Sequence, residues 1–252
     1  MSSSRSLHPQ IQLKNVSLYS KIGSQTILQD ISLEVKSGDR IALVGISGAG
    51  KTSLLRLLNR LNSPSKGEIL FEGQNYTQIP VVQLRQQITL VLSETKLFGM
   101  TAREAISYPL KLRGLSEAEI TERFTKWTER LEIPFDWLNR TEIQLSSGQR
   151  QQIAIARALA IQPKVLLLDE AVTALDFVNQ QKILRTLQTL SEPEITIILA
   201  THHLDLISDW GDQLWHLSHG KLIQNTPTQR LQWQALKQQF RQAQQQDAEE
   251  WE

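Results

Sequence analysis

A glycine-rich octapeptide at positions 45–52 combines residue types that are suited to holding phosphate. Its sequence is Gly45-Ile46-Ser47-Gly48-Ala49-Gly50-Lys51-Thr52, which matches the pattern of glycine, four residues, glycine, lysine and threonine. Glycines let the backbone turn so that successive N–H groups point at phosphate oxygens. Lys51 adds positive charge for the β- and γ-phosphates, and the Thr52 hydroxyl is a suitable ligand for Mg²⁺. The octapeptide therefore predicts binding of a nucleotide together with Mg²⁺.

An acidic pair, Asp169 and Glu170, follows the apolar run Val165–Leu168. A buried strand of this kind delivers its next residues to the carboxyl edge of a sheet, where ligands bind in open α/β folds. There Asp169 is placed to hold Mg²⁺ through water, and Glu170 to polarise the water that attacks the γ-phosphate. An exposed acidic turn is the alternative interpretation. The phosphate loop in the same chain favours the catalytic one.

The segments around these motifs predict alternating strands and helices. The short apolar strand Arg40–Val44 enters the glycine-rich loop, and a leucine-rich helix, Lys51–Leu61, leaves it until Asn62-Ser63-Pro64 stops it. Further predicted strands are Ile11–Ser20, Ile27–Lys36, Gly67–Gly73, Ile88–Leu92 and Ile195–Ala200, and further predicted helices are Val81–Gln86, Ser147–Ala160 and Phe177–Leu190. Strand–helix alternation predicts a mostly parallel sheet covered by helices.

Two regions differ from this alternation. From Gly99 to Arg140 the pattern is helical and polar, with Ser116 and Glu119 as a capping box, which indicates an inserted helical subdomain. Near the C-terminus, half of residues 229–246 are glutamine. There Thr226-Pro227 is interpreted as a helix cap with a first-turn proline. Trp233, Leu236 and Phe240 share one helical face, so the tail is expected to dock as one amphipathic helix.

We therefore predict three regions. Residues 10–98 and 161–225 form an ATP-binding α/β core with an N-terminal β subdomain, residues 99–160 form a helical subdomain, and residues 226–252 form a glutamine-rich helical tail.

The composition limits the other classes of function. The chain has 252 residues, a net charge of +1 and no cysteine, so no overall charge favours nucleic acid, and disulfides and thiolate chemistry are excluded. Met1–Gln10 is polar and serine-rich, unlike a secretory signal. The most apolar runs are far shorter than the about 20 residues of a membrane-spanning helix. A cytoplasmic chain is expected, whose membrane role would come through a partner.

Between the two motifs stands Leu145-Ser146-Ser147-Gly148-Gln149, which resembles the signature pentapeptide of ABC ATPases. The resemblance extends over residues 10–225. It implies a phosphate-loop NTPase core with a mostly parallel sheet, an N-terminal antiparallel β subdomain and an inserted helical subdomain. In that family the signature clamps the γ-phosphate of ATP on the opposite subunit. Ser146 or Ser147 can also serve as a helix N-cap, and the two roles are compatible.

The resemblance assigns further residues. Tyr19 stands where the family places an aromatic that stacks on adenine, although packing is the commoner role of a single aromatic. His202 resembles the histidine that contacts the γ-phosphate, with His203 as the competing residue. Ala174-Leu175-Asp176 resembles a loop that crosses the dimer interface. The resulting nucleotide contacts are Tyr19, Gly45, Ser47, Gly48, Ala49, Gly50, Lys51, Thr52, Ser53, Ser146, Ser147, Gly148 and Gln149; Lys51, Glu170 and His202 are the catalytic residues, and Thr52, Asp169 and Ser93 the metal contacts.

Two positions depart from the family pattern. The family ends the strand Ile88–Leu92 with a glutamine near the metal and the membrane subunit, whereas this chain has Ser93 followed by Glu94. We expect Ser93 to act through water, with Glu94 as the rival. Ala171-Val172-Thr173 replaces the usual proline–threonine–serine run. Both changes concern coupling and turnover more than ATP binding.

The resemblance implies an ATPase subunit of an ABC transporter that acts as a nucleotide-sandwich dimer. It would work with an integral membrane permease, without nucleic acid, on the cytoplasmic face of the inner (plasma) membrane. The alternative is a soluble ABC ATPase acting on proteins, as in iron–sulphur cluster assembly. The sequence leaves open the solute, the direction of transport, whether the dimer is homomeric or heteromeric, the effect of Ser93 and the role of the tail.

Overall fold

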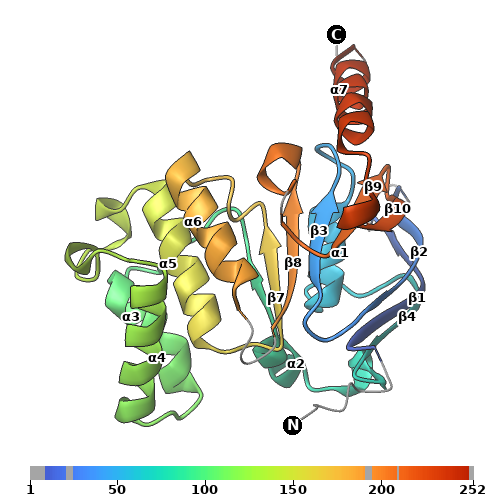
Figure 1. Cartoon of the computed structure of the whole chain (residues 1–252). Coiled ribbons are helices and arrows are strands. Elements are labelled where there is room, and N and C mark those ends of the chain that lie inside the picture. The colour runs from blue at the N-terminus through green and yellow to red at the C-terminus, as the bar shows by residue number, and fades with distance from the viewer. Residues whose placement is uncertain (1–8, 21–24, 191–194, 209, 250–252) are drawn as a thin grey trace. The chain divides into compact units, whose positions relative to one another are not determined.

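The computed structural model describes residues 9–20, 25–190, 195–208 and 210–249, the last seven of these by their backbone only (Figure 1). The chain divides into two compact units. The first unit combines residues 1–85 with residues 200–252, and the second unit is formed by residues 86–199.

An antiparallel sheet with the strand order β2-β1-β4-β5 forms one part of the first unit. Its strands are β1 (Ile11–Tyr19), β2 (Thr26–Val35), β4 (Lys66–Phe71) and β5 (Gln74–Asn75). Leu13 of β1 pairs with Leu33 of β2 and with Ile69 of β4. Along the second half of β2, buried and exposed side chains alternate, as a half-covered sheet requires. The antiparallel pairing of β1 and β2 confirms the N-terminal antiparallel β subdomain that the family resemblance implies.

The strand that enters the glycine-rich loop, β3 (Arg40–Val44), pairs in parallel with β9 (Gln213–Ser218). β9 also pairs antiparallel with β10 (Lys221–Pro227). The interpretation of Thr226-Pro227 as the start of the C-terminal helix is wrong, because these residues end β10 opposite Leu214 and Gln213 and are followed only by a short 3₁₀ turn, Thr228–Arg230. Proline lacks an N–H donor, and the outer position of β10 tolerates that loss.

Helix α1 (Lys51–Leu58) follows the glycine-rich loop and ends before the predicted Leu61. Arg60 adopts a left-handed backbone conformation with φ 55°, and the N–H groups of Leu61 and Asn62 both donate to the Arg56 carbonyl. The Arg60 guanidinium donates to the carbonyls of Tyr76 and Ile79 at 3.0 and 2.6 Å. The helix thus ends before the predicted stop signal Asn62-Ser63-Pro64, at a point where Arg60 donates hydrogen bonds to a distant part of the chain.

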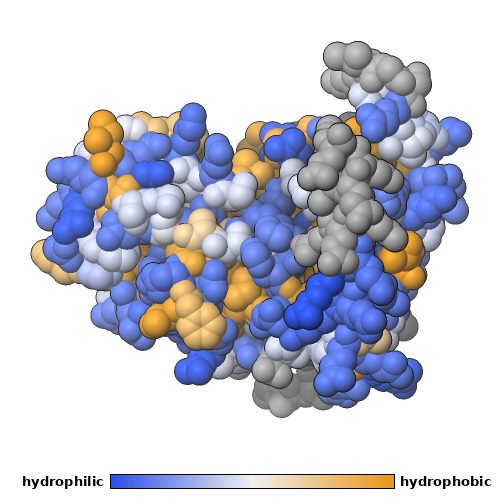
Figure 2. All heavy atoms as spheres, turned by 90° about the horizontal axis from the view of Figure 1, so that it is seen from above, coloured by the Kyte–Doolittle hydropathy of each residue, from blue (hydrophilic) through white to orange (hydrophobic). Residues whose placement is uncertain are grey.

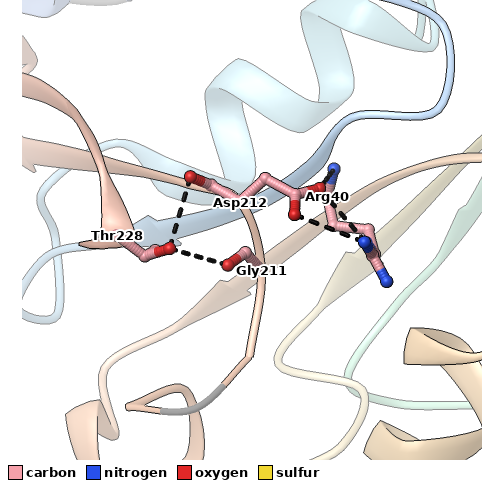
Figure 3. Close-up of polar contacts among 4 residues, drawn as sticks. All are labelled: Arg40, Gly211, Asp212 and Thr228. Carbon is pink, nitrogen blue, oxygen red and sulfur yellow. Dashed lines mark hydrogen bonds and ion pairs between the residues drawn. The ribbon is translucent and has the colours of Figure 1, made fainter.

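The C-terminal helix α7 (Trp233–Glu249) docks through one face, as predicted. Leu236 and Phe240 are buried, and the Phe240 ring lies 4.7 Å from the ring of His216 on β9. Before the helix begins, the Thr228 hydroxyl donates to the Gly211 carbonyl at 2.8 Å, and the neighbouring Asp212 carboxylate accepts from Arg40 (Figure 3). These bonds fix the point from which the tail leaves the sheet.

The second unit contains most of the long helices. They are α3 (Ala102–Leu112), α4 (Glu117–Arg130), α5 (Ser147–Ala160) and α6 (Phe177–Gln188), and the short α2 (Val81–Gln87) lies at the boundary between the units. The predicted Ser116–Glu119 capping box is present at the start of α4. Strand β6 (Ile88–Val91) pairs in parallel with β7 (Val165–Asp169), and β8 (Thr196–Thr201) follows α6.

Together the parallel strand pairs, the antiparallel sheet and the helices confirm the predicted α/β fold class. The predicted division at residues 99, 161 and 226 stays a prediction. Within the described ranges, the structure has no helix long and apolar enough to cross a membrane. The face in Figure 2 is mainly hydrophilic, with hydrophobic residues in small separate groups. The most exposed large apolar side chains described are Phe98, Phe135, Ile143 and Val178.

Candidate nucleotide site

The glycine-rich loop spans positions 45–50, between β3 and α1 of the first unit. At each of its three glycines, the structure explains why a larger residue would not fit or would strain the backbone. A Cβ atom at Gly45 would lie 2.4 Å from the Leu217 carbonyl oxygen, and one at Gly50 would lie 2.9 Å from Leu28 Cδ2. Gly48 has open space around it but a φ of +77°, which L side chains rarely adopt. Close approach and backbone conformation therefore require glycine in this loop.

Lys51 and the first turn of α1 give the loop its positive character. The Lys51 ammonium is buried and donates to the carbonyls of Gly45 and Ile46 at 2.7 and 3.0 Å. No side chain caps the helix at Gly50, and the N-terminal end of a helix is the end that favours an anion. Thr52 and Ser53 follow in that first turn and are half-buried. The loop therefore fits a phosphate chain, as the sequence predicts.

The acidic pair lies at the end of β7 in the second unit. Asp169 is the last strand residue and is 3% exposed. Glu170 follows with a left-handed φ of 51°, a conformation uncommon outside glycine and frequent at functional positions. The turn is closed by Thr173, whose hydroxyl and N–H both donate to the Glu170 carbonyl, at 2.6 and 3.2 Å. Thr173 of the divergent run thus holds the conformation of the predicted catalytic base.

The signature residues begin α5. Ser146 is the N-cap: its hydroxyl accepts from Gln149 N–H at 3.2 Å, and the Gln149 side chain accepts from Ser146 N–H at 2.9 Å. The capping role therefore belongs to Ser146, and Ser147 occupies the first helical position. A Cβ atom on Gly148 would lie 3.2 Å from the carbonyl of Ala174. The structure thus brings the signature together with the loop 174–176, whose Asp176 caps α6.

Hydrogen bonding to Asp176 shows how that cap is stabilised. Its carboxylate accepts from the backbone N–H of Asn179 at 3.0 Å. This bond, followed by the one from the Asn179 side chain, lowers the pKa of Asp176 below its ordinary value. The carboxylate therefore remains charged at the positive end of α6.

Ser93 lies two residues beyond the end of β6 and is exposed, as is Glu94. The segment is held by Gln151 of α5, whose side-chain amide donates to the Leu92 carbonyl at 2.8 Å and accepts from the Thr95 hydroxyl at 2.9 Å. Sequence reasoning missed Gln151 and Thr95. The available signal was a glutamine two residues past the signature, but its burial depends on tertiary packing. The metal contact of Ser93 stays a prediction.

Tyr19 and His202 complete the predicted set in the first unit. Tyr19 ends β1 half-buried, and the Lys66 ammonium lies 5.6 Å from the centre of its ring. His202 follows β8 and is exposed, with its ring centroid 4.0 Å from that of His203. The choice of His202 over His203 stays a prediction.

The donor set indicates which kind of metal fits. Among the residues that the structure describes, no group of three or more His, Asp or Glu side chains is placed to hold a metal ion. Thr52 and Asp169 offer oxygen donors, the type that Mg²⁺ prefers. A metal held with few protein ligands is the usual arrangement for Mg²⁺ that also contacts phosphates.

Comparison with known proteins places the chain in a family. A family model described as "ABC transporter" matches residues 28–173. The chain is 37% identical over 222 residues to the methionine import ATP-binding protein MetN 1 of Bacillus cereus, covering 85% of this chain and 64% of that protein. It is 35% identical over 219 residues to MetN of Caulobacter vibrioides, with 85% and 66% covered. The chain thus spans slightly less than two thirds of the length of these relatives.

Solved structures agree with this placement. CbiO1 of Clostridium perfringens, described as part of the ABC transporter complex cbiONQ, matches with a TM-score of 0.79 at 28% identity over 88% of this chain and 90% of that one. The dimeric ABC transporter cassette MJ0796 matches with a TM-score of 0.79 at 28% identity, covering 86% and 98%. The fold and the phosphate loop are those of an ATP-binding cassette. The chain belongs to the ABC transporter family.

Proposed function

We propose that this chain is the ATP-hydrolysing subunit of an ABC transporter. The main observation behind the proposal is the glycine-rich loop 45–50. The ammonium of Lys51 donates to a carbonyl of this loop, and no side chain caps the start of α1 that follows it. An ADP- and phosphate-bound form of MJ0796, similar to this chain with a TM-score of 0.77, supports hydrolysis as the reaction. The names of the import relatives favour a transporter over the soluble alternative.

The residues divide the chemistry between them. Lys51 and the loop amides neutralise the β- and γ-phosphates, and Glu170 orients and deprotonates the attacking water. His202 contacts the γ-phosphate, and Tyr19 supports the adenine. Mg²⁺, held by Thr52 and by Asp169 and Ser93 through water, would neutralise phosphate charge. The remaining predicted nucleotide contacts, Gly45, Ser47, Gly48, Ala49, Gly50 and Ser53, line the same loop and helix start.

The assembly part of the proposal concerns two partners. Two ATPase subunits, identical or different, would place the signature residues Ser146–Gln149 of each on the nucleotide of the other. A separate integral membrane permease would hold the pair at the cytoplasmic face of the membrane. Because the relatives are named for methionine import, methionine is the first solute to test.

The activity is tested by phosphate release from Mg-ATP with the purified chain and with the Lys51→Ala variant. We expect hydrolysis by the unmodified chain and a loss of at least about 100-fold in the variant, because the main phosphate charge is removed. Equal rates in the two proteins would contradict the proposal.

The transporter role is tested by affinity purification of the tagged chain from membranes. We expect a protein with several membrane spans to co-purify with it. Recovery of the chain solely with soluble proteins would contradict the membrane half of the proposal and favour the soluble alternative.

A further inference from the structure

The segment after β6, residues 92–97, is held by side chains that come from α5 and from the turn before it. Gln151 binds Leu92 and Thr95, as described above. The Arg157 guanidinium donates to the Lys96 carbonyl at 3.3 Å. The Glu142 carboxylate accepts from Leu97 N–H at 2.9 Å. Four of the six residues in the segment therefore have a polar contact with α5 or with the turn that precedes it.

Gln151 is the central and best-protected of these contacts. Gln151 is 1% exposed. Both ends of its side-chain amide make hydrogen bonds, the nitrogen as a donor and the oxygen as an acceptor. A buried amide with both ends paired has one favoured orientation, and leaving either partner unpaired costs free energy. The segment and the helix are thus joined by a contact that water does not readily replace.

The turn before α5 belongs to the same connected set. The Arg150 guanidinium donates to the carbonyls of Glu142 and Leu145, at 3.2 and 2.7 Å, while Glu142 holds Leu97. Leu145 is the first residue of the signature pentapeptide. Hydrogen bonds therefore connect the segment that contains Ser93 to Leu145, the first residue of the signature, and to Arg150 and Gln151, which follow the signature.

We propose that Gln151 is a positioning residue for hydrolysis, which keeps the Ser93 segment and the signature helix moving as one body. The proposal rests on the proposed ATPase function, in which Ser93 lies near the metal of one nucleotide and Ser147 acts on the other. Gln151 itself touches neither nucleotide. Because ATP binding depends mainly on the loop 45–50 and Lys51, loosening Gln151 affects turnover rather than binding.

Gln152 provides a matched control. It is the next residue on α5, is 2% exposed, and donates from its side chain to the Leu131 carbonyl at 2.7 Å. Its contact leads to the end of α4 and not to the segment 92–97. Gln151→Leu and Gln152→Leu therefore remove equally buried amides from the same helix, and only the first releases the segment.

The test uses the full chain and measures kcat and KM for Mg-ATP, thermal unfolding, and amide hydrogen exchange in peptides covering 92–98. For Gln151→Leu we expect kcat to fall by about tenfold, KM to change by less than about twofold, and exchange in 92–98 to accelerate by about fivefold or more. For Gln152→Leu we expect a similar loss of thermal stability with kcat and the exchange of 92–98 unchanged.

The other end of the contact gives an independent comparison. Thr95→Val removes the hydroxyl donor and should lower kcat in the same direction, whereas Thr95→Ser keeps the hydroxyl and should retain the rate. Equal losses of kcat in Gln151→Leu and Gln152→Leu, or unchanged exchange of 92–98 in Gln151→Leu, would overturn the positioning role. Failure of the ATPase proposal is recognised separately, because the unmodified chain would then be no faster than Lys51→Ala.

Discussion

Glu170 adopts a left-handed backbone conformation directly after a buried strand, and Thr173 closes the turn that holds it. If Glu170 is the general base, Glu170→Gln removes the proton acceptor while the phosphate loop remains intact. We expect kcat to fall by about 10² to 10⁴-fold with ATP still bound. Steady-state hydrolysis and equilibrium nucleotide binding, measured on the same preparation, check this prediction.

A matched variant separates chemistry from folding. Thr173→Val removes the hydroxyl contact to the Glu170 carbonyl but keeps the carboxylate, so we expect a smaller loss of kcat than in Glu170→Gln. Near-normal hydrolysis by Glu170→Gln would show that another group accepts the proton.

Ser93 and Glu94 are both exposed beyond β6, so their relative importance is decided by chemistry rather than burial. If Ser93 reaches the metal only through water, Ser93→Gln brings an amide closer and should raise basal turnover by about threefold. Glu94→Ala should leave Mg²⁺-dependent turnover unchanged. ATPase rates over a Mg²⁺ titration distinguish the two, and a collapse in Glu94→Ala without gain in Ser93→Gln would favour Glu94.

At the scale of elements, the packing of α7 on β9 encloses a histidine. His216 lies against Phe240, and its burial lowers the pKa of the imidazole from 6.5 to about 4. Below pH 6.5 the unfolded chain binds a proton at this position that the folded chain does not bind. The free energy of unfolding therefore decreases as the pH falls from 6.5 towards 4, by up to roughly 3 kcal/mol.

Urea unfolding at pH 7.5 and at pH 4.5 measures this loss. In His216→Leu we expect a smaller loss of stability between the two pH values than in the unmodified chain. His219→Gln is the control, because His219 is the histidine nearest in sequence on the same hairpin but is exposed at the β9–β10 turn. An equal pH dependence in His216→Leu and the unmodified chain would contradict the assignment to His216.

At the scale of the whole molecule, the signature should act on a nucleotide that another subunit binds. Ser147 is the first residue of α5 and is not required as its N-cap, since Ser146 fills that role. Ser147→Arg should therefore abolish hydrolysis, by at least about 100-fold, while the chain still binds ATP. Nucleotide binding by isothermal titration and phosphate release check both halves of this prediction.

Mixing experiments test the cross-subunit role directly. Ser147→Arg chains mixed with Lys51→Ala chains should regain at most one competent site in each mixed dimer. Loss of ATP binding in Ser147→Arg alone would show that the signature merely supports its own chain.

Local patterns were sufficient where a short run of residues sets its own conformation. The bounds of α5, the Ser116–Glu119 capping box and the strand–loop–helix around Lys51 all follow from neighbouring residue types. The error at Thr226-Pro227 has the opposite cause, because partners on β9 decide whether a proline ends a strand or begins a helix. The contact set of Gln151 was equally invisible, since its partners are more than fifty residues away in sequence.

The sequence by itself determined the α/β class, the phosphate loop and the family resemblance, because each depends on residue types at fixed spacing. Tertiary structure decided that α1 ends near Arg60 and that Gln151 holds the segment after β6. These outcomes depend on which distant carbonyls and hydroxyls come within hydrogen-bond distance. Spacing along one chain does not contain that information, because packing alone brings such groups together.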